Sequence, residues 1–261
     1  MEKWTINMNV FEKKELNDQV SLVIHQLLDE FNRLIQSEPP MGFKPIKLIN
    51  DRDAGPTFYW PLGKDFYKIG LNVSGVYYNQ IAFQFSQELG RIYCDPRINS
   101  WLIELLCHIA ALYSLDFLGH KWEENPPDKE LEDYWYNFDS YKSNLLGAAF
   151  SKVDMVKYQV ANEWVEYQIK KLRKKDHLNR GKLLIIAYEL LPMFKEHPES
   201  WKILPYVGKC SVPPPPEDPK SLVTKRVTEP DFGKLKQMLP EELNTFAGKF
   251  FMKIGAKEYI K

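Results

Sequence analysis

The sequence has few cysteines, no excess charge of either sign and no long apolar run free of charged residues. Its three cysteines, Cys94, Cys107 and Cys210, are spaced for neither a disulfide framework nor a Cys-x-x-Cys metal site. Lysine and arginine together number 35, as do aspartate and glutamate, so the net charge is zero. Because nonspecific nucleic-acid binding relies on a positive excess, we expect no nucleic-acid partner.

Little in the sequence would direct the protein to a membrane. The opening residues, MEKWTINMNV, lack the apolar stretch of a secretion signal. The most apolar segment, 102–118, contains Glu104, His108 and Asp116 and is short for a bilayer span. We therefore expect a cytoplasmic protein with no membrane partner. The sequence predicts no oligomeric state.

Several common catalytic signatures are also missing. The sequence has no glycine-rich phosphate-binding loop and no Gly-x-Ser-x-Gly elbow of a serine hydrolase. Cys107 and His108 are adjacent, but neighbouring residues of a helix point about 100° apart and cannot form a nucleophile pair. The most basic run, 168–182, is typical of a solvated helix face, and a phosphate contact is the alternative.

Apolar periodicity predicts helices over most of the chain. Spacing of three and four residues predicts an opening helix over 13–36, and three short extended segments follow it. After Pro126 and Pro127 the pattern is helical nearly throughout. The extended segments are 46–49, 57–60 and 66–73, and the later predicted helices are 76–93, 99–118, 129–148, 154–174, 178–195, 198–206, 231–238 and 240–254.

These elements predict an α+β protein. We expect a small N-terminal sheet, mixed or antiparallel, packed on the helix pair 76–118, and a mainly helical C-terminal half that closes a cleft. We divide the chain into subdomains 1–125 and 126–261. The run SVPPPPEDPK at 211–220 cannot continue a helix, which predicts an extended strap. A ligand for a proline-binding module is the alternative.

The first helix of the pair has one apolar and one polar side. Gln80, Gln84, Gln87, Glu88 and Arg91 share the polar side. By itself, this pattern indicates an amphipathic helix with its polar side in water.

The second helix is apolar nearly all round, which is typical of a helix inside a protein. Glu104 and His108 nevertheless share one of its faces, because they are four residues apart. A buried carboxylate without a partner is costly. We therefore expect Glu104 to pair with Arg91, the cation that the neighbouring helix offers.

The two helices contain the segments QELGR at 87–91 and WLIE at 101–104. With these segments, residues 66–122 resemble zincin metallopeptidases. In that superfamily a first helix carries His-Glu-x-x-His and a second helix supplies a glutamate as third zinc ligand. QELGR at 87–91 occupies the position of His-Glu-x-x-His, and WLIE at 101–104 resembles the Trp-x-x-Glu of the second helix. The segment is similar to a group of uncharacterised bacterial zincin-like proteins with a QFxHExxH helix followed by a WFEExLCExASL helix.

The departures from this pattern fall on the metal ligands. Gln87 and Arg91 replace both histidines, whereas Glu88 and Glu104 keep the acids of the general-base and third-ligand positions. Glutamine is a poor zinc ligand, and a guanidinium has no lone pair to offer. The resemblance thus implies a zincin-like fold with a degenerate metal site, no zinc cofactor and no catalytic residue. Arg91 would replace the positive charge of the lost metal.

Three functions remain open from the sequence. The first is a catalytically inactive, pseudo-metallopeptidase protein that binds a peptide or protein in the remnant cleft, with 66–73 as the edge strand that accepts it. The second is a divergent metal-dependent hydrolase that uses Glu88, Glu104 and His108 with zinc or another metal. The third is a helical interaction or regulatory protein unrelated to peptidases. The remnant site comprises Gln87, Glu88, Arg91, Glu104 and His108.

Overall fold

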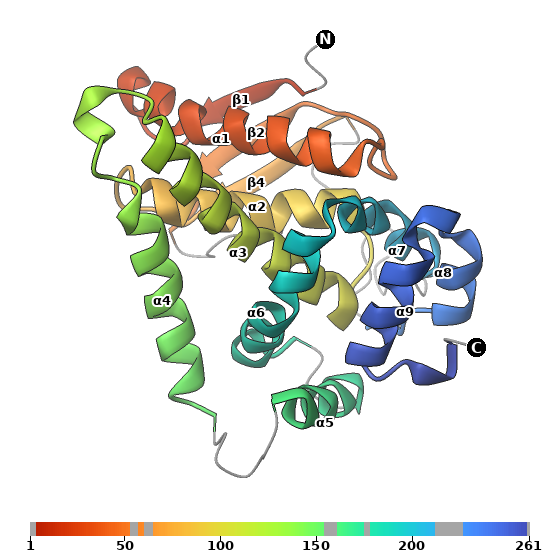
Figure 1. Cartoon of the computed structure of the whole chain (residues 1–261). Coiled ribbons are helices and arrows are strands. Elements are labelled where there is room, and N and C mark those ends of the chain that lie inside the picture. Colours follow the sequence, from red (N-terminus) through yellow and green to blue (C-terminus); the bar gives the residue numbers. More distant parts are fainter. Residues whose placement is uncertain are drawn as a thin grey trace.

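The computed structural model describes residues 4–52, 57–59, 65–153, 161–174, 178–211 and 227–259. The protein is α+β, with a small sheet near the N-terminus and a mostly helical remainder (Figure 1). Except for Ser211, the predicted proline-rich strap lies outside the described residues.

Nine α-helices and four short 3-10 helices occur in these described ranges. The α-helices are α1 (Lys14–Ile35), α2 (Tyr78–Cys94), α3 (Trp101–Glu124), α4 (Tyr136–Phe150), α5 (Ala161–Lys174), α6 (Arg180–Glu196), α7 (Leu204–Lys209), α8 (Phe232–Met238) and α9 (Asn244–Lys253), and the 3-10 helices are Lys129–Leu131, Pro198–Ile203, Glu241–Leu243 and Lys257–Tyr259.

The sheet has four strands in the order β1-β2-β4-β3. Strands β1 (Ile6–Asn9), β2 (Ile46–Asn50) and β4 (Tyr67–Leu71) are parallel, and β3 (Thr57–Tyr59) is antiparallel to β4. The sheet is therefore mixed, one of the two forms expected from the sequence.

One expectation about the strands was wrong, and one strand was missed. The segment 66–73 was expected to be an edge strand, but β4 lies inside the sheet between β2 and β3. The edges of the described sheet are β1 and β3. In addition, β1 was not predicted, because its sequence INMN contains two asparagines, which are depleted in strands.

One face of the sheet is apolar and buried. Ile46 of β2 lies beside Tyr67 of β4, and Leu48 lies beside Ile69, and all four are fully buried. The alternate position Lys47 is exposed. Helix α1 contacts β1, and α2 contacts β4 and α1, so these two helices bury the apolar side (Figure 1).

The predicted helices agree with the structure to within a few residues, with two exceptions. The predicted helix 129–148 begins only at Tyr136, after a 3-10 turn and an irregular segment. Helix α3 continues to Glu124, six residues beyond the predicted end at 118. The predicted helix 154–174 can be compared only over its described part, 161–174.

Helix α3 is the central element of the protein. It contacts α2, α4 and α6, which lie around it (Figure 1). Its length and composition would allow it to span a membrane, but 72% of its most apolar 18-residue window is buried inside the protein. The apolar surface of α3 is therefore used for packing against its neighbouring helices.

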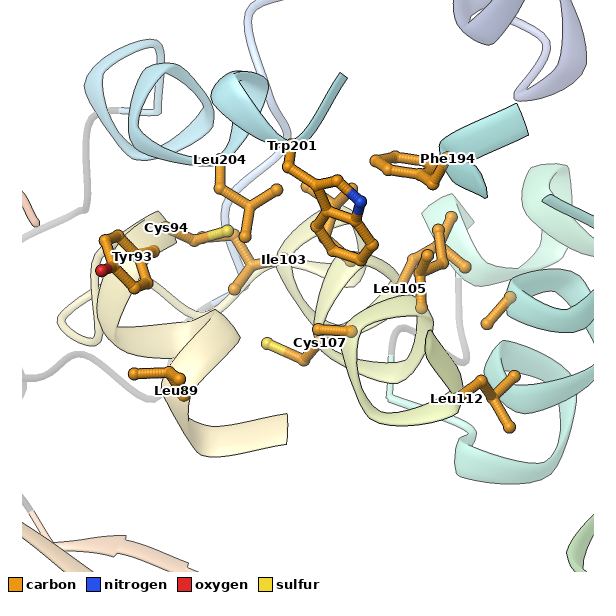
Figure 2. Close-up of a cluster of buried hydrophobic side chains, with 14 of the residues drawn as sticks. Leu89, Tyr93, Cys94, Ile103, Leu105, Cys107, Leu112, Phe194, Trp201 and Leu204 are labelled. Carbon is orange, nitrogen blue, oxygen red and sulfur yellow. The ribbon is translucent and has the colours of Figure 1, made fainter. Parts of the chain in front are cut away.

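The buried side chains of both halves of the chain form one continuous cluster, which extends from Trp4 to Ala256. Figure 2 shows a part of it, where side chains of α2 and α3 meet Phe194 of α6 and Trp201. The rings of Phe194 and Trp201 are 5.0 Å apart, and Trp201 also meets Phe31 of α1 at 5.5 Å. Trp201 thus joins the first helix of the chain to the C-terminal half.

Helix α7 lies directly on the C-terminal end of α2, and Gly208 makes this approach possible. A Cβ atom at Gly208 would lie 1.7 Å from the carbonyl oxygen of Cys94 and 2.7 Å from the Cβ of Asp95. A Cβ atom does not approach a nonbonded oxygen or carbon atom to such distances, so either α7 or the end of α2 would have to move.

We therefore expect Gly208→Ala to destabilise the protein by about 3 kcal/mol, as overpacking against a fixed backbone does. Gly248→Ala on α9 is the matched control, because a Cβ there would meet nothing within 4 Å. That control should stabilise the protein by up to about 1 kcal/mol through higher helix propensity. Urea denaturation measures both, and equal effects of the two substitutions would contradict the close contact.

Candidate functional site

The polar side of α2 is buried. Gln84 and Gln87 are each 6% exposed and Glu88 is 2% exposed. The interpretation that the pattern of α2 gives by itself, with this side in water, is therefore wrong. Helices α3 and α4 both contact α2 (Figure 1), and Arg91 on this side bonds to Glu104 of α3.

Two of the glutamines hold the end of β4 against α2. Gln84 accepts a hydrogen bond from the backbone N–H of Asn72 at 2.8 Å and donates to the Asn72 carbonyl at 3.1 Å. Gln80 donates to the same carbonyl at 2.7 Å. Both side chains therefore have a structural role at the strand–helix connection.

Helices α2 and α3 come close together at Gly90. A Cβ there would lie 3.3 Å from the Cβ of Ala110 and 3.4 Å from the Cα of Cys107. The absence of a side chain at this position lets the two helices approach, which brings the next residue, Arg91, against α3. Ser100 begins α3 by accepting a hydrogen bond from the N–H of Leu102 at 3.3 Å.

Arg91 bonds to both acids of the predicted site. Its Nε donates to Glu88 Oε2 at 3.0 Å, its Nη2 donates to Glu104 Oε2 at 2.9 Å, and its Nη1 contacts Glu104 Oε1. The side chains of Arg91 and Glu104 are 15% and 14% exposed. The expected pair of Glu104 with Arg91 is confirmed, and it is a two-point contact of the kind that a guanidinium makes with a carboxylate. We call these three residues the Arg91 cluster.

The two acids respond differently to Arg91. Burial disfavours ionisation of Glu104, but the charge and the two hydrogen bonds of Arg91 outweigh it, so the pKa of Glu104 is lowered. Burial raises the pKa of Glu88, and the neighbouring negative charge of Glu104 adds to this, while Arg91 offsets part of the rise. Arg91 therefore stabilises the ionised form of Glu104 more than that of Glu88.

His108 lies near the Arg91 cluster but does not join it. Its Nδ1 is 2.8 Å from the carbonyl oxygen of Glu104, and because a carbonyl can only accept, Nδ1 carries the proton. Burial lowers the pKa of His108, which favours the neutral ring. The Nε2 atom of a neutral ring with this tautomer is a hydrogen-bond acceptor.

The residues present do not fit a zinc ion. Both oxygens of Glu104 already bond to Arg91, and Gln87 and Arg91 stand in place of imidazoles. The alternative set of Glu88, Glu104 and His108 has the same difficulty, since Arg91 holds both acids. Within the ranges that the structure describes, no group of three histidine, cysteine, aspartate or glutamate side chains is arranged to hold a metal ion.

A pocket of about 270 Å³ adjoins the site. Gln87 and His108 line it from α2 and α3, and two cations, Lys152 and Arg180, line it from the segment after α4 and from the start of α6. The remaining lining is mostly apolar and comes from Phe83, Tyr141, Leu145, Ala148, Ala149 and Leu184, together with Gln84 and Gly181.

No known protein family, curated protein or solved structure matches this chain significantly. The similarity of residues 66–122 to zincins thus remains a resemblance carried by the residues of the helix pair.

Sequence reasoning missed the two cations of the pocket. Arg180 belongs to the basic run 168–182, which was interpreted as a solvated face, and it is indeed exposed. Lys152 lies outside both the basic run and the helix pair. Their common position at one pocket depends on how α4 and α6 pack on α3, and no local sequence pattern encodes that packing.

Arg91→Met tests the Arg91 cluster. We expect a loss of about 3–5 kcal/mol in the free energy of unfolding, because Glu88 and Glu104 would remain buried without a cation. The matched control is Lys170→Met, which removes a cation paired with Glu166 at the surface of α5. Its cost should stay below about 1 kcal/mol. If urea denaturation gave the same small loss for both variants, the cluster would contribute little to stability.

The pH dependence of the Tm shows whether Arg91→Met destabilises the protein through its two unpaired acids or through lost packing. In the wild type the lowered pKa of Glu104 contributes stability above its ordinary pKa, and that contribution is lost as the pH falls through the folded value. In Arg91→Met, burial alone would raise the pKa of both acids, so stability would be lost as the pH rises through the raised values. The difference in Tm between the two proteins should therefore shrink from about pH 7 to about pH 4.5. A constant difference would point to packing instead.

Proposed function

We propose that the protein is a catalytically inactive zincin-like protein that binds a peptide in the pocket beside its helix pair. The observation that carries this proposal is the Arg91 cluster. Arg91 stands where the resemblance puts the second metal histidine, and it bonds both to the residue at the general-base position and to the residue at the third-ligand position. One positive charge would thus have replaced another between the same two acids.

The arrangement of the elements supports the zincin-like interpretation. The resemblance requires a helix after the sheet and a second helix that brings a glutamate to the first. Here α2 follows β4, and α3 contacts α2. Glu104 of α3 bonds to Arg91, which also bonds to Glu88. The cost of a buried acid by itself would pair Glu104 with Arg91. The further support for the resemblance is that Glu88, at the general-base position, bonds to the same guanidinium.

The same contacts argue against hydrolysis by the usual zincin route. Glu88 would have to accept a proton from a metal-bound water. Instead its Oε2 accepts a hydrogen bond from Arg91 Nε, and a fixed guanidinium would repel a divalent ion beside it. Binding is the activity that this site retains.

The volume of the pocket suits part of a peptide. Ligand pockets are usually about 300–1,000 Å³, so this one, at about 270 Å³, has room for one or two residues. Strand addition at β4 is ruled out because β4 already has two neighbours. A peptide that used backbone pairing would have to add to an edge of the sheet, and the pocket can hold its end or one of its side chains.

The double substitution Gln87→His with Arg91→His tests the ancestry. It restores two imidazoles on one helix face beside Glu104, so we expect about one zinc per protein, whereas the wild type should take up far less. Metal content is measured on protein purified without a histidine tag. Adding Glu104→Gln to the double variant should abolish the uptake. Zinc binding by the wild type at the level of the double variant would overturn the proposal.

Filling the pocket tests the binding function itself. Ala148→Trp places a large ring at an exposed lining position of α4, and Ser143→Trp adds the same ring to an exposed position of α4 that does not line the pocket. Fluorescence polarisation with a fluorescein-labelled pool of random octapeptides should show binding by the wild type and by Ser143→Trp. Ala148→Trp should lose it. The proposal is wrong if the wild type does not bind the pool, or if both tryptophan variants bind it equally well.

A further inference from the structure

Gln87 is a buried polar side chain that the fold itself does not use. It is 6% exposed and lines the pocket. Gln80 and Gln84 on the same side of α2 have hydrogen-bond partners, but the amide of Gln87 has none among the residues that the structure describes. Its amide is not one of the fully buried polar atoms that lack a partner, so it is open to the pocket and can bond to a polar group that enters there.

His108 offers a second unused group to the same pocket. Its ring is 4% exposed, and its Nδ1–H is taken by the carbonyl of Glu104. Its Nε2 has no partner within the described part of the chain. A neutral imidazole with this tautomer accepts a hydrogen bond, and thus fits an N–H group of a ligand.

Another part of the pocket wall is positive. Lys152 and Arg180 are exposed and line it, and neither makes an ion pair with a described residue. Among the described residues no acidic side chain lines the pocket, and Glu88 and Glu104 already bond to Arg91. The two cations are therefore available to an anion.

The first turn of α6 adds to this positive wall. The Asn179 carbonyl accepts from the N–H of Leu183 at 2.9 Å, and the Asn179 side chain accepts from the N–H of Lys182 at 3.1 Å. The N–H groups of Arg180 and Gly181 have no partner inside the helix, as is usual for a first turn. Because Gly181 lines the pocket without a side chain, its backbone is accessible to an anion there.

We infer that the pocket binds a carboxylate attached to an apolar group and an adjoining N–H, which is the chemistry of a peptide or protein C-terminus that ends in a large apolar residue. The carboxylate would meet Arg180 and Lys152, and the terminal side chain would enter between Phe83, Tyr141 and Leu184. The N–H of the last residue would donate to His108. This inference rests on the proposed function and narrows its peptide to a free C-terminus.

The test compares a free C-terminus with a blocked one. The probe is fluorescein-Gly-Ser-Gly-Ala-Phe, made once as the free acid and once as the C-terminal amide, with Kd measured by fluorescence polarisation. We expect the acid to bind at least about tenfold more tightly than the amide. Arg180→Gln and Lys152→Gln should each weaken binding of the acid severalfold and leave that of the amide unchanged. Lys170→Gln on the surface of α5 is the control and should change neither.

A second arm identifies the source of the carboxylate. 3-Phenylpropanoate has the carboxylate and the ring but no N–H, so it should compete at least about tenfold less well than N-acetylphenylalanine. Equal competition would overturn the peptide part of the inference and assign the pocket to small apolar acids. Equal binding of the acid and amide probes, or no effect of Arg180→Gln, would overturn the inference as a whole. The proposed function would survive that result if the random octapeptides still bound in a way that Ala148→Trp abolishes.

Discussion

The contact between α2 and α3 depends on one guanidinium that is shared by two carboxylates. Arg91 has three nitrogens directed to Glu88 and Glu104, and the planar fork of an arginine allows this where the single ammonium of a lysine would not. The geometry requires the helices to lie close, and Gly90 allows that approach. Charge balance and backbone packing at this contact are therefore two parts of the same arrangement.

The residues on the polar side of α2 have two structural roles within about three turns of helix. Gln80 and Gln84 hold the end of β4, and Glu88 and Arg91 bond to one another and to α3. Only Gln87 faces the pocket without such a task. Under the proposed function, stability and ligand recognition fall to different residues of one helix face, so a change of ligand would not disturb the contact that holds the helices together.

The sequence predicted the helices and the pairing of Glu104 with Arg91 because both follow from local rules. Helical periodicity is local, and the cost of a buried acid demands a cation on the nearest element. The burial of Gln87 and the cations of the pocket were not predictable in this way. They depend on α4 and α6, which pack against the helix pair from distant parts of the chain. The interior place of β4 was missed for a related reason, since strand order depends on long-range pairing.

The position of β4 has a consequence for how the chain is assembled during synthesis. The strand order β1-β2-β4-β3 means that the last strand made occupies a central place in the sheet. While a ribosome is still producing the residues before Tyr67, β2 has an unpaired edge beside the apolar side chains of Ile46 and Leu48. Such an edge can pair with other chains. The edge of β2 is therefore covered only once Leu71 has been made and β4 can pair with it.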